Sequence, residues 1–327
     1  MRLRPLGVTG LEVTPVGLGL AALGRPAYID LGRDADLGGD RDVDDLERRS
    51  HQVLDAAWAA GVRYLDAARS YGRAEAFLAS WLHARGIDPA EVTVGSKWGY
   101  TYVGDWRMDA GTHEVKDHSL EALTRQAAES RELLGGHLDL YQIHSATLDS
   151  GVLEDRAVLD ELSRLRDQGI VAGLSTSGPG QADTIRRALE VTAGGAAPFA
   201  CVQATWNLLE RSAGPALAEA SAAGWGVIVK EAVANGRLSP HGTGPAAATL
   251  GRVASRHGVG VDAVALAAVL ANPWADVVLS GAVTAGQLQA NLAALQVELD
   301  PGELEELAAL AEPAEAYWAA RSALAWS

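Results

Sequence analysis

Lysine and cysteine are the scarcest chemically reactive residues in this sequence. Lysine occurs only at Lys97, Lys116 and Lys230, and the single cysteine is Cys201, in a chain of 327 residues. One cysteine excludes an intramolecular disulfide framework and a multi-cysteine metal site. The 27 lysine and arginine residues are outnumbered by 42 aspartate and glutamate residues, which gives a formal net charge of −15. Because no run of basic residues occurs, we expect no nucleic-acid partner.

A long uninterrupted apolar run is also missing. The longest candidate, residues 261–279, is interrupted by two aspartates, an asparagine and a proline, whereas a membrane-spanning helix needs about 20 consecutive apolar residues. Residues 15–24 are apolar but rich in glycine, so they make a poor signal-peptide core. We therefore expect a cytoplasmic protein without a membrane partner.

Short β-branched or apolar runs alternate with longer amphipathic segments along almost the whole chain, which is typical of strands joined by crossover helices. We predict eight strands, at residues 16–19, 62–66, 92–96, 138–143, 171–175, 200–204, 226–230 and 276–280. Gly61, Gly86, Gly169 and Gly224 each stand where a helix would end before the next strand. No linker or shift in composition divides the chain. We therefore predict one α/β domain over residues 1–327, a (β/α)8 TIM barrel.

A doubly wound sheet is the main alternative, and it predicts G-x-G-x-x-G between the first strand and the first helix. In "VGLGLAALGRPA" the glycines Gly17, Gly19 and Gly24 have the wrong spacing. A long polar segment, residues 24–45, follows instead of a helix. A connector of this length is uncommon, so we interpret this first loop as either a mobile segment or a functional lid.

Polar and ionisable side chains recur at the predicted strand ends, which meet on one face of such a barrel. They are Asp66, Lys97, His144, Ser175, Thr176, Gln203, Lys230, Glu231 and Ser280. Tyr71 follows Asp66 by five residues. Each of the four most reactive groups has an ordinary explanation when taken alone: Lys97 could reach water, Asp66 could cap a turn, His144 could be a hydrogen-bonded core residue, and Tyr71 could simply be packed.

Together, Tyr71, Lys97, Asp66 and His144 form a coherent set for moving a proton to or from a carbonyl oxygen. A phenol has an ordinary pKa of about 10. A nearby lysine would lower that pKa, and an aspartate would keep the lysine charged and in place. A neutral histidine could then orient the carbonyl group.

Several stretches carry a resemblance to a known family. "GVRYLDAARSYG", "VGSKWG", "LDLYQIHSA", "GLSTSG" and "LSGAVTAGQLQANL" resemble the successive signatures of the aldo-keto reductase superfamily, in order. "RPLGVTGLEVTPVGLG" resembles the family's start, a β-hairpin that closes the bottom of the barrel. The resemblance implies a nicotinamide-dependent oxidoreductase of a small-molecule carbonyl or alcohol. It also implies that Tyr71 is the general acid or base, tuned by Lys97 and Asp66, and that His144 orients the carbonyl.

The same resemblance assigns a set of residues to the cofactor. Ser175, Thr176 and Gln203 would hold the nicotinamide carboxamide, and the turn after the seventh strand would wrap the pyrophosphate. The region from Ser280 to Asn291 would hold the adenosine end. The implied cofactor-binding residues are Gly19, Leu20, Ser175, Thr176, Gln203, Lys230, Glu231, Ala232, Asn235, Gly236, Leu238, Gly281, Thr284, Gln287 and Asn291.

The sequence departs from the family pattern at several of these positions. Thr176 stands where many members have asparagine, and Lys230 where many have a tyrosine that stacks on the nicotinamide. Gly281 and Gln287 occupy positions where well-known members place basic residues against the 2′-phosphate of NADP. The resemblance implies NADP as the cofactor, and the loss of these cations leaves NAD as an alternative.

For the substrate, Tyr28, Trp98 and Trp106 are candidates for lining an aromatic pocket, or alternatively for covering the barrel rim. "GRPAYI", at the start of the first loop, resembles family members that oxidise sugars or pyridoxal. A catalytically silent, reductase-like regulatory subunit is an alternative of another class.

Two other barrel enzymes fit the sequence less well. A glycosidase needs two facing carboxylates, and only Asp66 and Glu231 are available at strand ends. A metal-dependent hydrolase would need more ligands than His144 and Asp66, so we expect no metal. The sequence leaves the substrate and the oligomeric state open.

Overall fold

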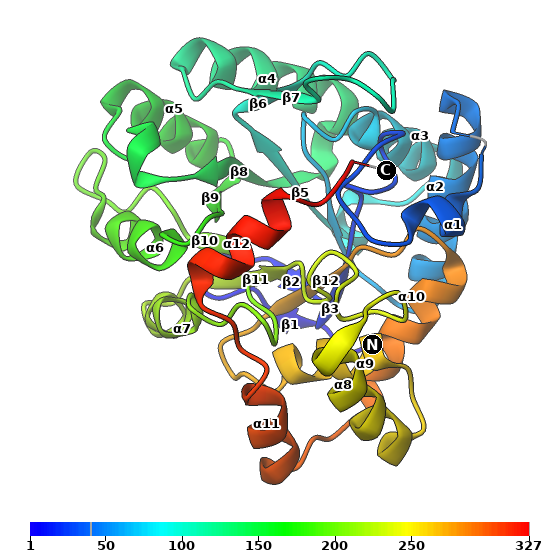
Figure 1. Cartoon of the computed structure of the whole chain (residues 1–327). Coiled ribbons are helices and arrows are strands. Elements are labelled where there is room, and N and C mark those ends of the chain that lie inside the picture. The colour runs from blue at the N-terminus through cyan, green and yellow to red at the C-terminus, as the bar shows by residue number, and fades with distance from the viewer. Residues whose placement is uncertain (40, 327) are drawn as a thin grey trace.

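The computed structural model describes residues 1–39 and 41–326. Its centre is a closed barrel of parallel strands in the order β10-β11-β12-β3-β4-β5-β8-β9 (Figure 1). The strands are β3 (Val16–Gly19), β4 (Tyr64–Asp66), β5 (Thr93–Trp98), β8 (Leu138–Ala146), β9 (Val171–Thr176), β10 (Cys201–Thr205), β11 (Gly226–Lys230) and β12 (Val277–Ser280). All eight coincide with predicted strands, so the (β/α)8 barrel is confirmed. The sequences of these strands do not alternate between apolar and polar residues, because both faces of a parallel barrel strand are buried.

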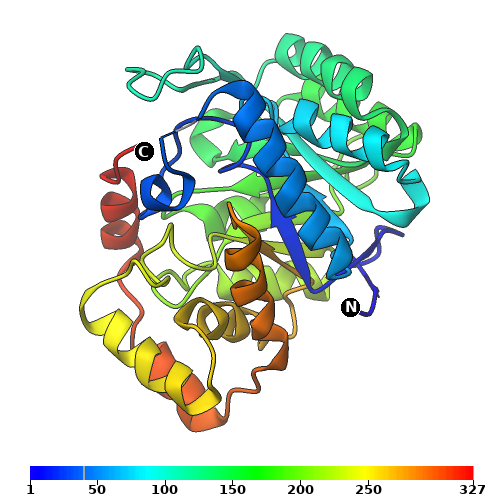
Figure 2. The same cartoon turned by 90° about the vertical axis from the view of Figure 1, so that its right-hand side faces the viewer.

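A short antiparallel hairpin, β1 (Arg4–Pro5) and β2 (Glu12–Val13), precedes the barrel. Leu6 and Val13 are fully buried with Tyr64 and other residues of the barrel interior. The hairpin lies against the start of β11, because a Cβ atom on Gly7 would stand 2.3 Å from the backbone nitrogen of Gly226. The predicted closure of the barrel bottom is thus confirmed. Figure 2 shows this N-terminal end on the opposite side of the molecule from α12.

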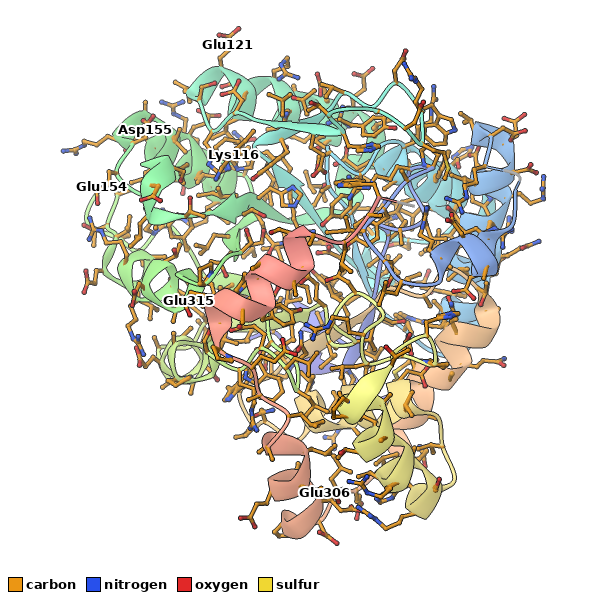
Figure 3. The ribbon with its side chains drawn as sticks, in the orientation of Figure 1. Lys116, Glu121, Glu154, Asp155, Glu306 and Glu315 are labelled. Atoms are coloured by element: carbon orange, nitrogen blue, oxygen red, sulfur yellow. The ribbon has the colours of Figure 1, made fainter. Side chains whose placement is uncertain are left out.

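Helices surround the barrel (Figure 1). They are α1 (Arg33–Leu37), α2 (Val43–Ala59), α3 (Ala74–Arg85), α4 (Leu120–Leu134), α5 (Arg156–Asp167), α6 (Gln181–Glu190), α7 (Gly214–Ala222), α8 (Gly244–His257), α9 (Val261–Leu270), α10 (Ala285–Leu292), α11 (Pro301–Ala308) and α12 (Ala314–Ser322), with 3₁₀ turns at Pro89–Glu91, Gly135–His137, Leu148–Ser150 and Ala293–Gln296. The four glycines predicted to end helices all have positive φ, between 61° and 90°. Acidic side chains such as Glu121 and Glu154 lie at the periphery (Figure 3).

Within the described ranges, no single helix is both long and apolar enough to cross a membrane, and α8 and α9 meet that test only as a pair bent by 86°.

Three segments cover the C-terminal end of the barrel. The first loop contains α1 and the start of α2, so it is more structured than the sequence indicated. A small antiparallel sheet, β6 (Tyr100–Tyr102) and β7 (Glu114–Lys116), follows β5 and was not predicted. The third segment is α12 with the residues after it, which crosses this end of the barrel in Figure 1.

The first loop is joined to the turn after β11, which we call the belt loop (residues 231–242). Leu31 N donates to Asn235 O at 3.1 Å, and Asn235 Nδ2 donates to Ile29 O at 2.8 Å. Between the two hypotheses for the first loop, these contacts favour a lid.

Candidate active site

A cavity of about 690 Å³ opens at the C-terminal ends of the strands. Tyr71 and His144 line one end of it, and Gln287 and Asn291 on α10 line the other. The belt loop and the first loop both contribute to the wall between these ends. We call the two ends the reaction end and the far end. The two groups of lining residues are thus chemically different.

At the reaction end, Lys97 and Asp66 form a fully buried ion pair. The Lys97 ammonium donates to Asp66 Oδ1 and also to Ala67 O at 3.0 Å. Asp66 Oδ2 accepts from Gln203 Nε2 at 2.8 Å and from the Tyr64 hydroxyl at 3.3 Å. Burial lowers the pKa of Lys97, and the Asp66 carboxylate opposes that shift. The carboxylate is therefore the main group that keeps this lysine charged.

Tyr71 lies directly above this pair, with the Lys97 ammonium 4.9 Å from the centre of its ring. Burial, reinforced by Asp66, raises the pKa of Tyr71 well above its ordinary value of 10.0, while Arg25 acts in the opposite direction. We expected Lys97 to lower the pKa of Tyr71, and the structure differs because burial removes water from the hydroxyl. The phenol is accordingly held in its protonated form.

His144 packs against Tyr71 with a ring-centre separation of 5.4 Å in an edge-on arrangement. Its Nδ1 atom is 3.2 Å from the Ser70 hydroxyl. Burial lowers the pKa of His144 well below its ordinary value of 6.5, and the cations Lys97 and Lys230 lower it further. The imidazole is therefore neutral at physiological pH, as orienting a carbonyl group requires.

Arg25 is a buried cation at this end that sequence reasoning missed. Its guanidinium donates to Glu114 at 2.7 Å and to Ser70 O at 3.2 Å. It also lies 4.9 to 5.2 Å from the ring centres of Tyr28, Tyr71 and Trp326. The last of these rings stacks on His113 at 4.2 Å. Arg25 belongs to a loop whose conformation could not be predicted, so no sequence pattern indicates that its side chain lies in this site.

A second buried charge cluster stands at the end of β11. Lys230 Nζ donates to Thr205 Oγ1 at 2.8 Å and lies 3.7 Å from Glu231. Arg321 on α12 donates from Nε to Glu231 Oε2 at 2.9 Å. Burial lowers the pKa of Lys230 to about 8, whereas Lys230 and Arg321 lower the pKa of Glu231 to about 2 against the effect of burial. This cluster ties α12 to the barrel.

Several buried polar atoms near the cavity have no partner in the part of the chain that the structure describes. They include Gln203 Oε1, Thr176 Oγ1 and Asn235 Oδ1. A buried acceptor without a donor is costly, and the amide group of a nicotinamide ring is a donor of the required kind. The residues present therefore fit that group. Ser175 fits less well, because its hydroxyl accepts from Ser145 N at 2.8 Å.

The belt loop offers backbone donors to the same cavity. Glu231, Ala234 and Asn235 have positive φ values of 58°, 50° and 52°. These residues and their neighbours bend the chain so that the N–H groups of Ala232 and Val233 have no partner among the described residues, and both residues line the cavity. Consecutive free N–H groups in a tight turn form a concave anion site, which suits a pyrophosphate.

The structure places most, though not all, of the sequence-predicted residues at the cavity. Those that line it are Gly19, Tyr28, Asp66, Tyr71, His144, Gln203, Lys230, Glu231, Ala232, Asn235, Gly236, Gly281, Gln287 and Asn291. Leu20 and Leu238 are fully buried in the hydrophobic core, and Thr284 caps α10 by accepting from Gln287 N at 3.1 Å. Ser177, which was not predicted, lines the cavity next to Thr176.

Neither Trp98 nor Trp106 reaches the cavity. Trp98 is fully buried with a core cluster and contacts His118 edge-on at 5.7 Å. Trp106 contacts Phe77 at 6.3 Å and donates to Arg41 O at 2.9 Å. Successive strand residues face opposite sides, so Trp98 must point away from the interior into which Lys97 points. Tyr100 and Trp326 line the cavity instead.

Comparison with known proteins gives consistent results. A model described as "Aldo/keto reductase family" matches residues 36–312. The chain is 26% identical over 184 residues to an "Uncharacterized oxidoreductase YqkF" of Bacillus subtilis, covering 55% of this chain and 50% of that protein. It is 31% identical over 163 residues to a pyridoxal 4-dehydrogenase of Microbacterium luteolum, covering 43% and 42%. The chain thus spans half or less of the length of these two relatives.

Among solved structures, the fold is similar to that of the aldo-keto reductase AKR11C1 from Bacillus halodurans in its holo form. The TM-score is 0.70 at 22% identity, with 96% of this chain and 97% of the other covered. At this identity the likeness establishes the barrel architecture alone.

Proposed function

Since the chain belongs to the aldo/keto reductase family, we propose that it is a nicotinamide-dependent oxidoreductase that interconverts an aldehyde or ketone and the corresponding alcohol. One observation carries the proposal. The Tyr71 ring lies over the buried Lys97–Asp66 pair and beside neutral His144, in the wall of a cavity of about 690 Å³.

The nicotinamide ring, when bound, donates or accepts the hydride. In the reduction, Tyr71 gives its hydroxyl proton to the carbonyl oxygen as negative charge develops there. The raised pKa of Tyr71 keeps the proton available at any physiological pH. Lys97 and Arg25 then stabilise the phenolate that remains, because each lies about 5 Å from the phenol ring.

His144 acts as an orienting group. Its Nδ1 atom is engaged by Ser70, which leaves Nε2 to donate to the carbonyl oxygen when the proton resides there. A charged imidazolium would compete with Tyr71 as the acid, and the lowered pKa of His144 prevents this. Asp66 acts through Lys97 and is a positioning residue.

The remaining cofactor contacts follow from the atoms left without partners. Gln203 Oε1 would accept from the nicotinamide carboxamide, and the belt-loop N–H groups would donate to the pyrophosphate. The far end of the cavity, at α10, is the remaining space for the adenosine. These contacts fit NAD and NADP equally well, because the two cofactors differ only at the 2′ position of that adenosine.

The test is a Tyr71→Phe variant. Loss of one general acid is expected to lower kcat by about 10²- to 10⁴-fold, while NADH or NADPH still quenches the tryptophan fluorescence of the protein. Tyr100→Phe is the matched control, because Tyr100 also lines the cavity and its ring lies 5.0 Å from that of His144. Its kcat should stay within a few-fold of the original. A Tyr71→Phe variant with most of its kcat would contradict the proposal, and cofactor binding without any turnover would favour the regulatory subunit.

A second candidate is the reverse reaction, NAD-dependent oxidation of a pyridoxal-like or sugar alcohol. Two observations favour it: the relative that is named a pyridoxal 4-dehydrogenase, and the position of Arg25 and Tyr28, both from the "GRPAYI" segment, in the cavity wall. Assays with oxidised dinucleotide and pyridoxal or aldoses, run beside assays with reduced dinucleotide and aldehydes, distinguish the two directions.

A further inference from the structure

We propose that Asp36, on α1 in the first loop, selects NAD over NADP by occupying the place of the 2′-phosphate. The inference rests on the proposed function, because it assumes that the adenosine lies at the far end of the cavity. Asp36 lines this end together with Gly286, Gln287 and Ala290 of α10. It comes from a part of the chain 251 residues away from Gln287, which it contacts.

The side chain of Gln287 holds the carboxylate in place. Its Oε1 atom accepts from Val283 N at 2.9 Å, which fixes the orientation of the amide. The Nε2 atom consequently points to Asp36 and donates to Oδ2 at 2.6 Å. Gln287 thus uses its Oε1 atom and one of its two Nε2 hydrogens for contacts within the protein.

The charged residues around the far end also favour NAD over NADP. Among the described residues, the lysine and arginine side chains that line the cavity are Arg25, Lys230 and Arg321, and they belong to the clusters around Tyr71 and Glu231. His241 of the belt loop is the basic group near α10, and its Nε2 atom lies 3.3 Å from Asp36 Oδ2. Among the described residues that line the far end, a phosphate would therefore meet a carboxylate and no lysine or arginine.

The same carboxylate suits the NAD ribose. A carboxylate accepts hydrogen bonds from ribose hydroxyls, as acidic residues do in other dinucleotide sites. Asp36 Oδ1 accepts no hydrogen bond from residues 1–39 and 41–326, since both contacts of this carboxylate involve Oδ2. Asn235, with Oδ1 buried and without a partner, adds a second acceptor to the wall between the two ends. A phosphate carrying about 1.5 to 2 negative charges at roughly 5 Å from Asp36 would bind about tenfold more weakly even at the dielectric constant of water.

The experiment measures binding to the purified protein by isothermal titration with ADP-ribose and with 2′-phospho-ADP-ribose, which probe the far end without any turnover. ADP-ribose should bind at least about tenfold more tightly. Asp36→Asn keeps the shape of the side chain and removes its charge, so affinity for the 2′-phosphorylated probe should rise about tenfold while that for ADP-ribose changes little or falls.

Asp34→Asn is the matched control. Asp34 lies on the same helix and carries the same charge, but its side chain is 63% exposed and pairs with Arg41. Its removal should leave the ratio of the two affinities unchanged. Gln287→Arg alone should restore little binding of the phosphorylated probe, because Asp36 would neutralise the new cation, whereas the double variant with Asp36→Asn should restore much more.

Equal or tighter binding of the 2′-phosphorylated probe to the original protein would overturn the assignment of Asp36 and leave the proposed function intact. An Asp36→Asn variant with unchanged selectivity would overturn it as well. If neither probe nor NADH nor NADPH binds, the proposed function itself falls, and the Asp36 assignment falls with it.

Discussion

Replacing Asp66 by asparagine should destabilise the protein in a way that depends on pH. The substitution leaves the Lys97 ammonium buried without its carboxylate. Removing one partner of a buried pair costs about 3 to 5 kcal/mol. The cost has an upper limit, because Lys97 can lose its proton instead. With an unfolded pKa of about 10.4, deprotonation at pH 7 costs about 4.6 kcal/mol.

This limit falls as the pH rises. In the Asp66→Asn protein the pKa of Lys97 in the folded state is lowered further. At pH values between that pKa and about 10.4, the unfolded state therefore binds more protons than the folded state. Stability then increases with pH in this window, by up to about 1.36 kcal/mol per unit. From pH 7 to pH 9 the variant should regain as much as about 2.7 kcal/mol relative to the original protein, in which Asp66 supports the charge.

The assay is equilibrium unfolding in urea at pH 7 and pH 9, followed by the fluorescence of the nine tryptophans. Glu154→Gln is the control: Glu154 lies at the outer edge of the molecule (Figure 3), and its side chain is 66% exposed in a pair with Arg187. It should cost at most about 1 kcal/mol at either pH. A loss below about 1 kcal/mol for Asp66→Asn, or a loss of equal size at both pH values, would refute the reasoning.

Three further outcomes are expected. Lys97→Met should abolish turnover while dinucleotide binding persists, as measured by steady-state kinetics and fluorescence titration; an active variant would show that the lysine does not support Tyr71. The lowering of the pKa of Glu231 to about 2 by Lys230 and Arg321 corresponds to about 3 kcal/mol at pH 7, and Arg321→Ala should remove the part that Arg321 contributes. That stability is complete above pH about 4.3 and disappears as the pH falls toward 2, so urea unfolding should show the difference shrinking over this range. Trp326→Ala removes a ring that contacts Arg25 and Tyr28 and should raise KM for aromatic aldehydes roughly tenfold, with kcat nearly unchanged; an unchanged KM would place the substrate elsewhere.

The barrel and the core of the site could be predicted because they follow from local patterns. Each strand is a short apolar run, and each important polar residue stands at the end of one. Asp66, Lys97 and His144 therefore come together once the strands close into a barrel. Trp98 was placed wrongly relative to the cavity, although the alternation along β5 held the information: Lys97 points inward, so its neighbour points outward.

The rest of the site depends on contacts between loops that are distant in sequence. Asp36 meets Gln287, Arg321 meets Glu231, and Arg25 meets Trp326. No periodicity or spacing encodes these pairs, because loop conformation is set by the surfaces on which the loops rest. The pKa of Tyr71 was misjudged for a related reason. The size of the desolvation effect depends on how completely the surrounding loops bury the hydroxyl, and the sequence does not reveal that.

The bonds between the first loop and the belt loop have a kinetic consequence. Asn235 holds both Ile29 and Leu31, so a dinucleotide lying beneath this bridge could leave only after the two loops separate. Opening of such loops often limits the rate of turnover. Under the proposed function, release of the spent dinucleotide would then require this opening in every catalytic cycle.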